Sequence, residues 1–272
     1  MVSTYHYLPD SSLIKTQRTR STAGFKSGCF THRSVHRTLA LTCVLISGSV
    51  CAEVDAISLS QSLDWEQKLD RDGIQVFTAE VPSSPHRAVR STMQIETPLA
   101  VLVALVLDLD ACPRWAALCK ESYVMEQQSD TEFVAYTYND LPWPVKDRDA
   151  VTRVRWSFNP ETGQAYMQAD IMERDDATTK KALRLTTGVT SWTFTPNEQG
   201  TMVENFAHID PGGGMPAWVT NMLLVESPFD TLDAMRKLVA EGGYKATQVS
   251  FIAATLPPTG QKSDSEDVDA TQ

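Results

Sequence analysis

The stretch that decides the fold is residues 210–240, which read DPGGGMPAWVTNMLLVESPFDTLDAMRKLVA. The three glycines give the backbone high conformational freedom, and Pro216 then begins a long helix that extends to about Ala240. Pro228 falls inside this helix and should kink it near residues 226–227. Apolar residues recur along one stripe of the helix at Trp218, Met222, Val225, Phe229, Leu232, Met235 and Val239. Such a stripe needs an apolar surface to cover.

The segments before the helix supply that surface, because they alternate between apolar and polar residues and are separated by Pro-, Asn- and Gly-rich turns. Within one segment Val154 and Trp156 face one way, and Arg153 and Arg155 face the other. Short turns between strands predict an antiparallel meander. A helix packed on its concave face predicts an α+β domain. The expected strands are residues 122–128, 132–138, 149–158, 164–172, 182–194 and 201–209.

Upstream of these strands the pattern predicts a helix, two strands and a second helix. Residues 60–69 are expected to form a short amphipathic helix around Trp65, which Asp72-Gly73 ends. Strands over 74–78 and 88–96 follow, and Thr97-Pro98 then begins a helix that reaches Leu109. Its nine consecutive apolar residues, 99–107, imply burial on most sides and are too few to span a membrane.

The first 52 residues differ from the rest of the chain. A basic flank, an apolar run over 39–46 and small residues ending at Ala52 are typical of a secretory signal peptide, here with an N-terminal extension. The alternative is a short buried helix within a leader. Only six of the 24 Lys and Arg and one of the 34 Asp and Glu precede residue 53, so cleavage after Ala52 would leave 220 residues with a net charge of −15. A periplasmic or secreted protein is therefore expected.

Composition and charge bound the remaining possibilities. The chain has 42% hydrophobic and 21% charged residues, values typical of a globular protein. Its net charge of −10 argues against nucleic-acid binding, which needs a basic surface. No linker or repeat interrupts the chain, so residues 53–250 are expected to form one domain. Residues 251–272 are polar and acidic and predict a disordered tail.

Two of the five cysteines, Cys112 and Cys119, would remain after cleavage. In one straight helix their Cα atoms would lie about 10 Å apart, which is beyond disulfide reach. A bridge is possible only if a short helix begins at Pro113 and Cys119 lies outside it. A disulfide and a pair of free buried thiols both remain open. No metal site is expected, because no His or further Cys lies nearby.

Five groups of residues point to a known family. They are Trp65 with Asp72-Gly73-Ile74, residues 98–115, Pro142-Trp143-Pro144-Val145 leading to Arg148-Asp149, Trp192-x-Phe194-x-Pro196, and Asp210-Pro211-Gly212-Gly213 with Trp218 and Asn221. Together these motifs resemble the START domain, the steroidogenic-acute-regulatory-related lipid-transfer fold, in a bacterial exported form, over about residues 55–245. The resemblance implies a helix-grip fold, in which a curved antiparallel sheet wraps the C-terminal helix and encloses an apolar tunnel for one lipid or sterol.

The resemblance also suggests site residues. Arg148 and Asp149 are expected to form a structural ion pair that fixes the loop before them. Sterol-binding members carry an acid–arginine pair in the tunnel, and that arginine position falls near Val154 here, which argues against a sterol. A Met and aromatic stripe can also be ordinary core. The expected tunnel lining is Val154, Trp156, Met167, Trp192, Phe194, Trp218, Met222 and Phe229.

The expected function is binding of a lipid or other hydrophobic ligand, for carriage or sequestration in the cell envelope. We expect a monomer that uses no cofactor, has no enzymatic activity and touches membranes transiently through apolar loops such as 141–144. One alternative is a cyclase- or hydrolase-like enzyme of the helix-grip superfamily, with Arg148, Tyr166 and His208 as candidate polar groups. The other is an envelope interaction module that acts through its acidic surface.

Overall fold

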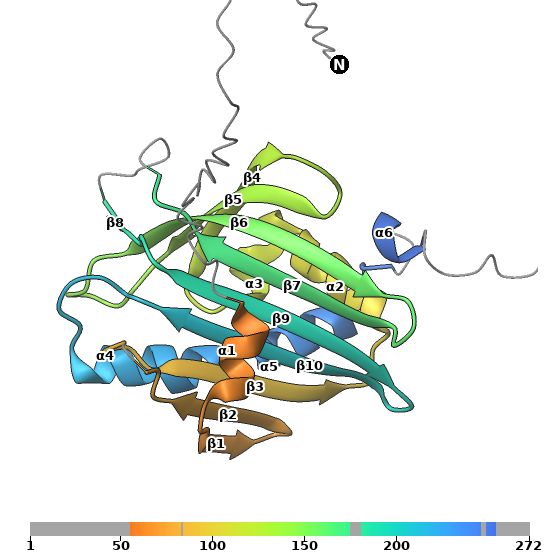
Figure 1. Cartoon of the computed structure of the whole chain (residues 1–272), viewed down its shortest axis with the longest axis horizontal. Coiled ribbons are helices and arrows are strands. Elements are labelled where there is room, and N and C mark those ends of the chain that lie inside the picture. Colours follow the sequence, from red (N-terminus) through yellow and green to blue (C-terminus); the bar gives the residue numbers. More distant parts are fainter. Residues whose placement is uncertain (1–54, 83, 175–180, 246–248, 254–272) are drawn as a thin grey trace, which may run out of the picture. The chain divides into compact units, whose positions relative to one another are not determined.

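The computed structural model describes residues 55–82, 84–174, 181–245 and 249–253. The predicted signal peptide and most of the predicted tail lie outside these residues. The described residues belong to one unit, Cys51–Gln272, whose frame is a single antiparallel sheet (Figure 1).

The sheet is curved and not closed, with the strand order β1-β2-β3-β10-β9-β7-β6-β5-β4 and the short β8 parallel to β6. The pairing of β3 with β10 departs from a simple meander, because it joins an N-terminal hairpin to the last strand. The strands are β1 (Glu66–Arg71), β2 (Ile74–Ala79), β3 (Ala88–Ile95), β4 (Cys119–Gln127), β5 (Glu132–Asn139), β6 (Arg148–Asn159), β7 (Gln164–Ile171), β8 (Leu183–Arg184), β9 (Gly188–Asn197) and β10 (Gly200–Ile209).

The helix predicted over residues 60–69 is wrong. The chain forms a shorter helix, α1 (Ala56–Ser62), and then the strand β1, which pairs with β2. Asp72 and Gly73 adopt φ values of 53° and 74°, the left-handed conformation that an Asp-Gly hairpin turn requires. The turn signal therefore joins two strands. Trp65 Nε1 donates to the carbonyl of Ser60 at 2.9 Å, which fixes the end of α1 against the hairpin.

The remaining helices cover the inner face of the sheet, opposite α1 (Figure 1). The helix α2 (Leu99–Leu107) is the predicted apolar run, and Leu102, Val103 and Leu105 are buried. It ends at Leu107, before a 3-10 turn, η1 (Leu109–Ala111), and a short helix, α3 (Cys112–Trp115). Among the helices of the described residues, none has the length and apolar character needed to cross a bilayer.

The predicted C-terminal helix is present but interrupted where Pro228 is expected to act. It consists of α4 (Ala217–Asn221), a π-helical turn, η2 (Met222–Glu226), and α5 (Ser227–Ala240). Pro228 lacks a backbone N–H and cannot donate to the preceding turn, so the wider π turn takes up the mismatch. Phe229, Leu232 and Met235 of α5 are buried under the sheet, whereas Trp218 of α4 is 52% exposed.

The structure joins Cys112 and Cys119 by a disulfide with a Cα–Cα distance of 6.0 Å. The helix α3 ends at Trp115, so Cys119 lies at the start of β4 and comes within reach. The tail boundary predicted at residue 251 is too early. A further helix, α6 (Ser250–Ala253), follows Val249. The apolar side chains of Val249 and Ile252 lie in the main hydrophobic core.

Candidate ligand-binding cavity

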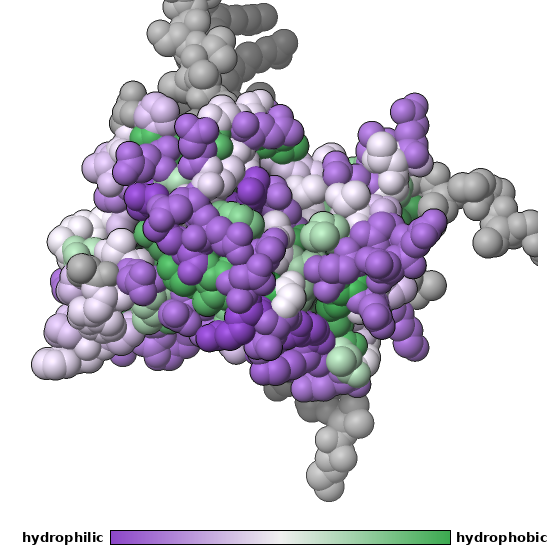
Figure 2. Space-filling view, turned by 90° about the horizontal axis from the view of Figure 1, so that it is seen from below, coloured by the Kyte–Doolittle hydropathy of each residue, from purple (hydrophilic) through white to green (hydrophobic). Residues whose placement is uncertain are grey.

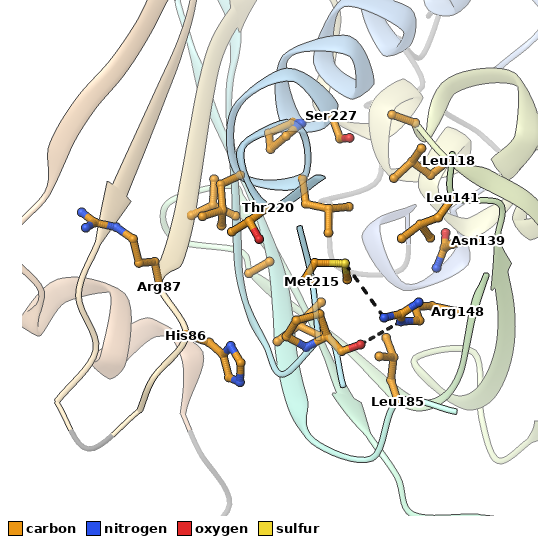
Figure 3. Close-up of a pocket in the computed structure, with 18 of the residues that line it drawn as sticks. His86, Arg87, Leu118, Asn139, Leu141, Arg148, Leu185, Met215, Thr220 and Ser227 are labelled. Atoms are coloured by element: carbon orange, nitrogen blue, oxygen red, sulfur yellow. Dashed lines mark hydrogen bonds between the residues drawn. The ribbon is translucent and has the colours of Figure 1, made fainter. Parts of the chain in front are cut away.

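A cavity of about 500 Å³ lies between the sheet and the segment that leads into α5. Side chains of β3 and β10, the loop joining β5 to β6, the glycine segment 211–215 and the helices α4 to α5 line it (Figure 3). Its size falls within the range of small-molecule sites, about 300–1,000 Å³. Much of the wall is aliphatic, including Val89, Leu118, Leu141, Leu185, Leu223 and Leu224.

Figure 2 shows a face of the molecule on which hydrophobic side chains lie in recesses between hydrophilic ones. The glycine segment borders the cavity, and Gly212 and Gly213 adopt φ values of 64° and 65°. A Cβ on Gly212 would lie 2.6 Å from Leu183 Cδ2. Glycine is therefore needed here for both the backbone conformation and the close approach to β8.

The side chain of Arg148 is 6% exposed and holds the glycine segment in place. Its Nε donates to the carbonyl of Pro211 at 2.8 Å and its Nη2 to that of Gly212 at 2.9 Å. Its Nη1 donates to the carbonyl of Lys146, and Nη2 also lies 4.0 Å from Met215 Sδ (Figure 3). Burial lowers the pKa of Arg148, although an arginine remains charged at physiological pH.

Asp149 points to the opposite face of β6 and has different partners. Both of its carboxylate oxygens accept from Arg184, at 3.1 and 3.0 Å, and Oδ2 also accepts from the Tyr136 hydroxyl at 3.2 Å. The predicted ion pair between Arg148 and Asp149 is therefore not formed, because adjacent residues of a strand face opposite ways. Each residue ties a different part of the chain to β6.

Three further polar residues of the lining come from three elements. Asn139, at the end of β5, lies beside Arg148 in Figure 3, and its side chain forms no hydrogen bond with any described residue. Asn205 of β10 donates to the carbonyl of Ser191 at 3.1 Å. Thr231 of α5 accepts from the backbone N–H of Ala117 at 3.0 Å. The cavity thus combines aliphatic walls with a few polar side chains, the arrangement usual for small-molecule sites.

Comparison with known proteins identifies the family. The model of the START domain matches residues 48–242. The chain belongs to the START domain family. An uncharacterised protein of Pseudomonas aeruginosa is 30% identical over 177 residues, which cover 64% of this chain and 85% of that protein. The phosphatidylcholine transfer protein of Mus musculus is 26% identical over 181 residues, 63% of this chain and 81% of that protein.

Solved structures agree with this assignment. The STAR-related lipid transfer protein of Xanthomonas axonopodis has a TM-score of 0.59 and 28% identity, covering 65% of this chain and 98% of that chain. Human STARD10 has a TM-score of 0.61 at 17% identity, covering 72% of this chain and 84% of that one, and supports the fold alone. The α+β helix-grip fold expected from the sequence is confirmed.

None of the eight residues expected to line a START tunnel belongs to the lining of this cavity. Val154, Trp156, Met167, Trp192, Phe194 and Phe229 lie together in the main hydrophobic core. Trp156 stacks on Phe194 with 6.2 Å between ring centroids, and Phe194 stacks on Trp192 at 6.1 Å. Trp218 is exposed and Met222 is half-buried on η2. Ligand contact by these eight residues stays a prediction.

The sequence analysis names neither the aliphatic residues that line the cavity nor Asn139. One feature could have pointed to Asn139. It and Arg148 lie at the two ends of the segment that holds the Pro-Trp-Pro loop, and they are register partners on β5 and β6. Partnered positions of neighbouring strands project to the same face of a sheet. Arg148 facing inward therefore places Asn139 inward as well.

The sequence offers three polar residues for an enzyme, Arg148, Tyr166 and His208. Only Arg148 lines the cavity, so the three do not converge there. His208 Nε2 lies 3.0 Å from Ser84 Oγ, and burial lowers the pKa of His208. Tyr166 donates to Gln168 Oε1 at 2.9 Å, and burial raises its pKa to about 12. Within the described residues, no three His, Cys, Asp or Glu side chains form a cluster suited to a metal ion.

Proposed function

We propose that this START domain binds a lipid or other hydrophobic ligand in the 500 Å³ cavity, for carriage or sequestration in the cell envelope, and that it has no enzymatic activity. The aliphatic wall under α4 and α5 is the observation that carries the proposal. Each methylene group that leaves water for this wall contributes about 0.8 kcal/mol. A ligand with a hydrocarbon chain therefore gains enough free energy to bind without covalent chemistry.

Ligand entry requires the segment 210–215 and α4 to move away from the sheet. Two contacts hold this segment closed: the hydrogen bonds of Arg148 to the carbonyls of Pro211 and Gly212, and the contact of His86 Nε2 with Asp210 Oδ1 at 3.1 Å. Both involve side chains from other elements. In the proposal, the glycines act as a hinge and the π turn before Pro228 lets α4 move separately from α5.

Exchange of the ligand would take place at a membrane surface. Trp143 is 90% exposed on the loop between β5 and β6, and Trp218 is 52% exposed on α4. Both segments border the cavity, and tryptophan favours the interface of a bilayer. The net charge of −10 opposes docking on anionic lipids, so the contact would rely on these apolar side chains.

The decisive experiment purifies the full chain from cells, extracts it with organic solvent and identifies the extracted molecules by mass spectrometry. A variant that fills the cavity, Ala207→Phe on β10, should lose the ligand. Ala240→Phe, at an exposed position of α5, is the matched control and should keep it. Equal recovery from both variants, or an empty wild-type protein that also takes up no added lipid, would contradict the proposal.

Envelope localisation is tested separately. The signal peptide prediction places cleavage after Ala52, so N-terminal sequencing of the protein recovered from the cells should begin at Glu53. Recovery of the uncleaved chain from the cytoplasm alone would remove the envelope from the proposal and leave ligand binding intact.

A further inference from the structure

The lining of the cavity contains no Asp or Glu, although the chain carries 34 acidic against 24 basic residues. Its cationic members are His86, Arg87 and Arg148. Arg87 directs its guanidinium away from the cavity, toward Glu66 and Glu80 at 3.5 and 3.4 Å (Figure 3). Only His86, paired with Asp210, and Arg148 therefore remain to be considered.

Arg148 differs from the other two because, among the described residues, no carboxylate forms an ion pair with it. Its N–H groups donate to the carbonyls of Pro211, Gly212 and Lys146. Burial lowers the pKa of Arg148, and the Asp147 carboxylate, which lies beyond ion-pair distance, acts in the opposite direction. A guanidinium has five N–H groups, so these three bonds leave two. One of the two faces Met215 Sδ at 4.0 Å, a weak acceptor that a ligand oxygen can replace.

Asn139 adds a second donor at the same place. It is the register partner of Arg148 across β5 and β6, and Figure 3 shows its amide beside the guanidinium. The Asn139 side chain has no hydrogen-bond partner among the described residues, so its N–H groups are available to a ligand. Leu141 and Leu118 lie on the Asn139 side of the pair and Leu185 on the Arg148 side (Figure 3), so a group bound there leaves most of its contact with water.

We propose, building on the proposed function, that the ligand is a single-chain amphiphile with an anionic oxygen headgroup, a carboxylate or a phosphate. The headgroup accepts hydrogen bonds from Arg148 and Asn139, and the chain lies along the aliphatic wall toward Leu223 and Leu224. Charge-assisted hydrogen bonds are about twice as strong as neutral ones. A buried cation without a carboxylate partner therefore selects an anionic group over a neutral one.

The size of the cavity bears on the number of hydrocarbon chains. Its volume of about 500 Å³ lies in the lower half of the range of small-molecule sites, about 300–1,000 Å³. We therefore assign it a ligand with one chain and not two.

The test measures binding to the delipidated full chain by isothermal titration calorimetry. The probes are palmitate and palmitoyl lysophosphatidate, each below its critical micelle concentration, the neutral hexadecanol below its solubility limit, and vesicles of dipalmitoyl phosphatidylcholine. At least one of the two anions should bind about tenfold or more tightly than hexadecanol. Asn139→Leu, which leaves the contacts of the glycine segment in place, should reduce that preference about three- to tenfold, because Arg148 remains, and should leave hexadecanol affinity within about threefold.

Arg148→Gln should abolish the preference, and Arg153→Gln, an equal change of charge at an exposed position of the same strand, should retain it. The anion that binds more tightly identifies the headgroup. Equal affinity for palmitate, lysophosphatidate and hexadecanol would overturn this inference and leave hydrophobic ligand binding standing. Uptake of phosphatidylcholine in preference to every single-chain probe would also overturn it. Failure of all four probes would count against the proposed function itself.

Discussion

Replacing Phe194 by alanine tests whether this side chain belongs to a packed core or lines a ligand tunnel. Phe194 on β9 is 0% exposed and lies between the rings of Trp156 and Trp192. Replacing a buried phenylalanine by alanine costs about 3–5 kcal/mol, through lost transfer free energy and the cavity left behind. Because two stacked neighbours also lose their contacts, we expect the upper half of that range for Phe194→Ala, about 4–5 kcal/mol.

The free energy of unfolding is measured by urea denaturation of the delipidated full chain, followed by circular dichroism. For a domain of this size, 4–5 kcal/mol corresponds to a decrease in Tm of about 8–20 °C. Phe77→Ala on β2, where the ring is half-buried under Arg90, is the control and should cost about 1 kcal/mol. Ligand affinity should not change in either variant.

The opposite result would refute the packing argument. If Phe194 faced a ligand-filled tunnel, its truncation would enlarge an existing space, so it would cost less than about 1.5 kcal/mol and would change ligand affinity. Together, these two observations would move the binding site from the cavity beside Arg148 to the region of the main core.

Three further changes test other features. Gly212→Ala should lower the free energy of unfolding, measured in urea, by about 1–2 kcal/mol. Gly212 has a φ of 64°, and a new Cβ there would press on Leu183. An unchanged urea midpoint would argue against the observed conformation. Cys112→Ser with Cys119→Ser should cost about 2–3 kcal/mol, as expected for a loop with a sequence separation of 7, and reductant should then have no further effect. Burial lowers the pKa of His208 below its usual 6.5, so the unfolded chain binds more protons and stability should fall as the pH drops below about 6.5. His208→Gln should flatten that part of the stability profile measured by thermal unfolding, and an identical profile would exclude His208 as its source.

The alternation along β6 and the apolar run of α2 could be predicted from the sequence because they depend on local periodicity. The sequence predicts the turn at Asp72-Gly73 but places its flanking segment in a helix. Residues 60–69 contain apolar residues at spacings that also fit a helix, and the pairing of β1 with β2 decides for a strand. Asp-Gly is itself a local hairpin signal, and here it outweighs the helical spacing.

The lining of the cavity shows the same limit. Inward-facing residues such as Trp156 and Val89 look equivalent along the chain, since each alternates with outward-facing neighbours. Trp156 is covered by α6, where the ring centroid of Phe251 lies 6.0 Å from that of Trp156, whereas Val89 lines the cavity. Whether a helix covers an inward-facing position of the sheet depends on helices that are distant in the sequence.

The sequence by itself indicated most of the element types, the family resemblance and the break that precedes the last helix, because periodicity, glycine and proline act within a few residues. Only the tertiary structure decided that Arg148 fastens the glycine segment 63 and 64 residues away and shares the cavity with Asn139. The physical reason is that a buried charged group must be hydrogen-bonded, and its partners are the groups that the fold places beside it. Sequence spacing carries no information about which carbonyls those are.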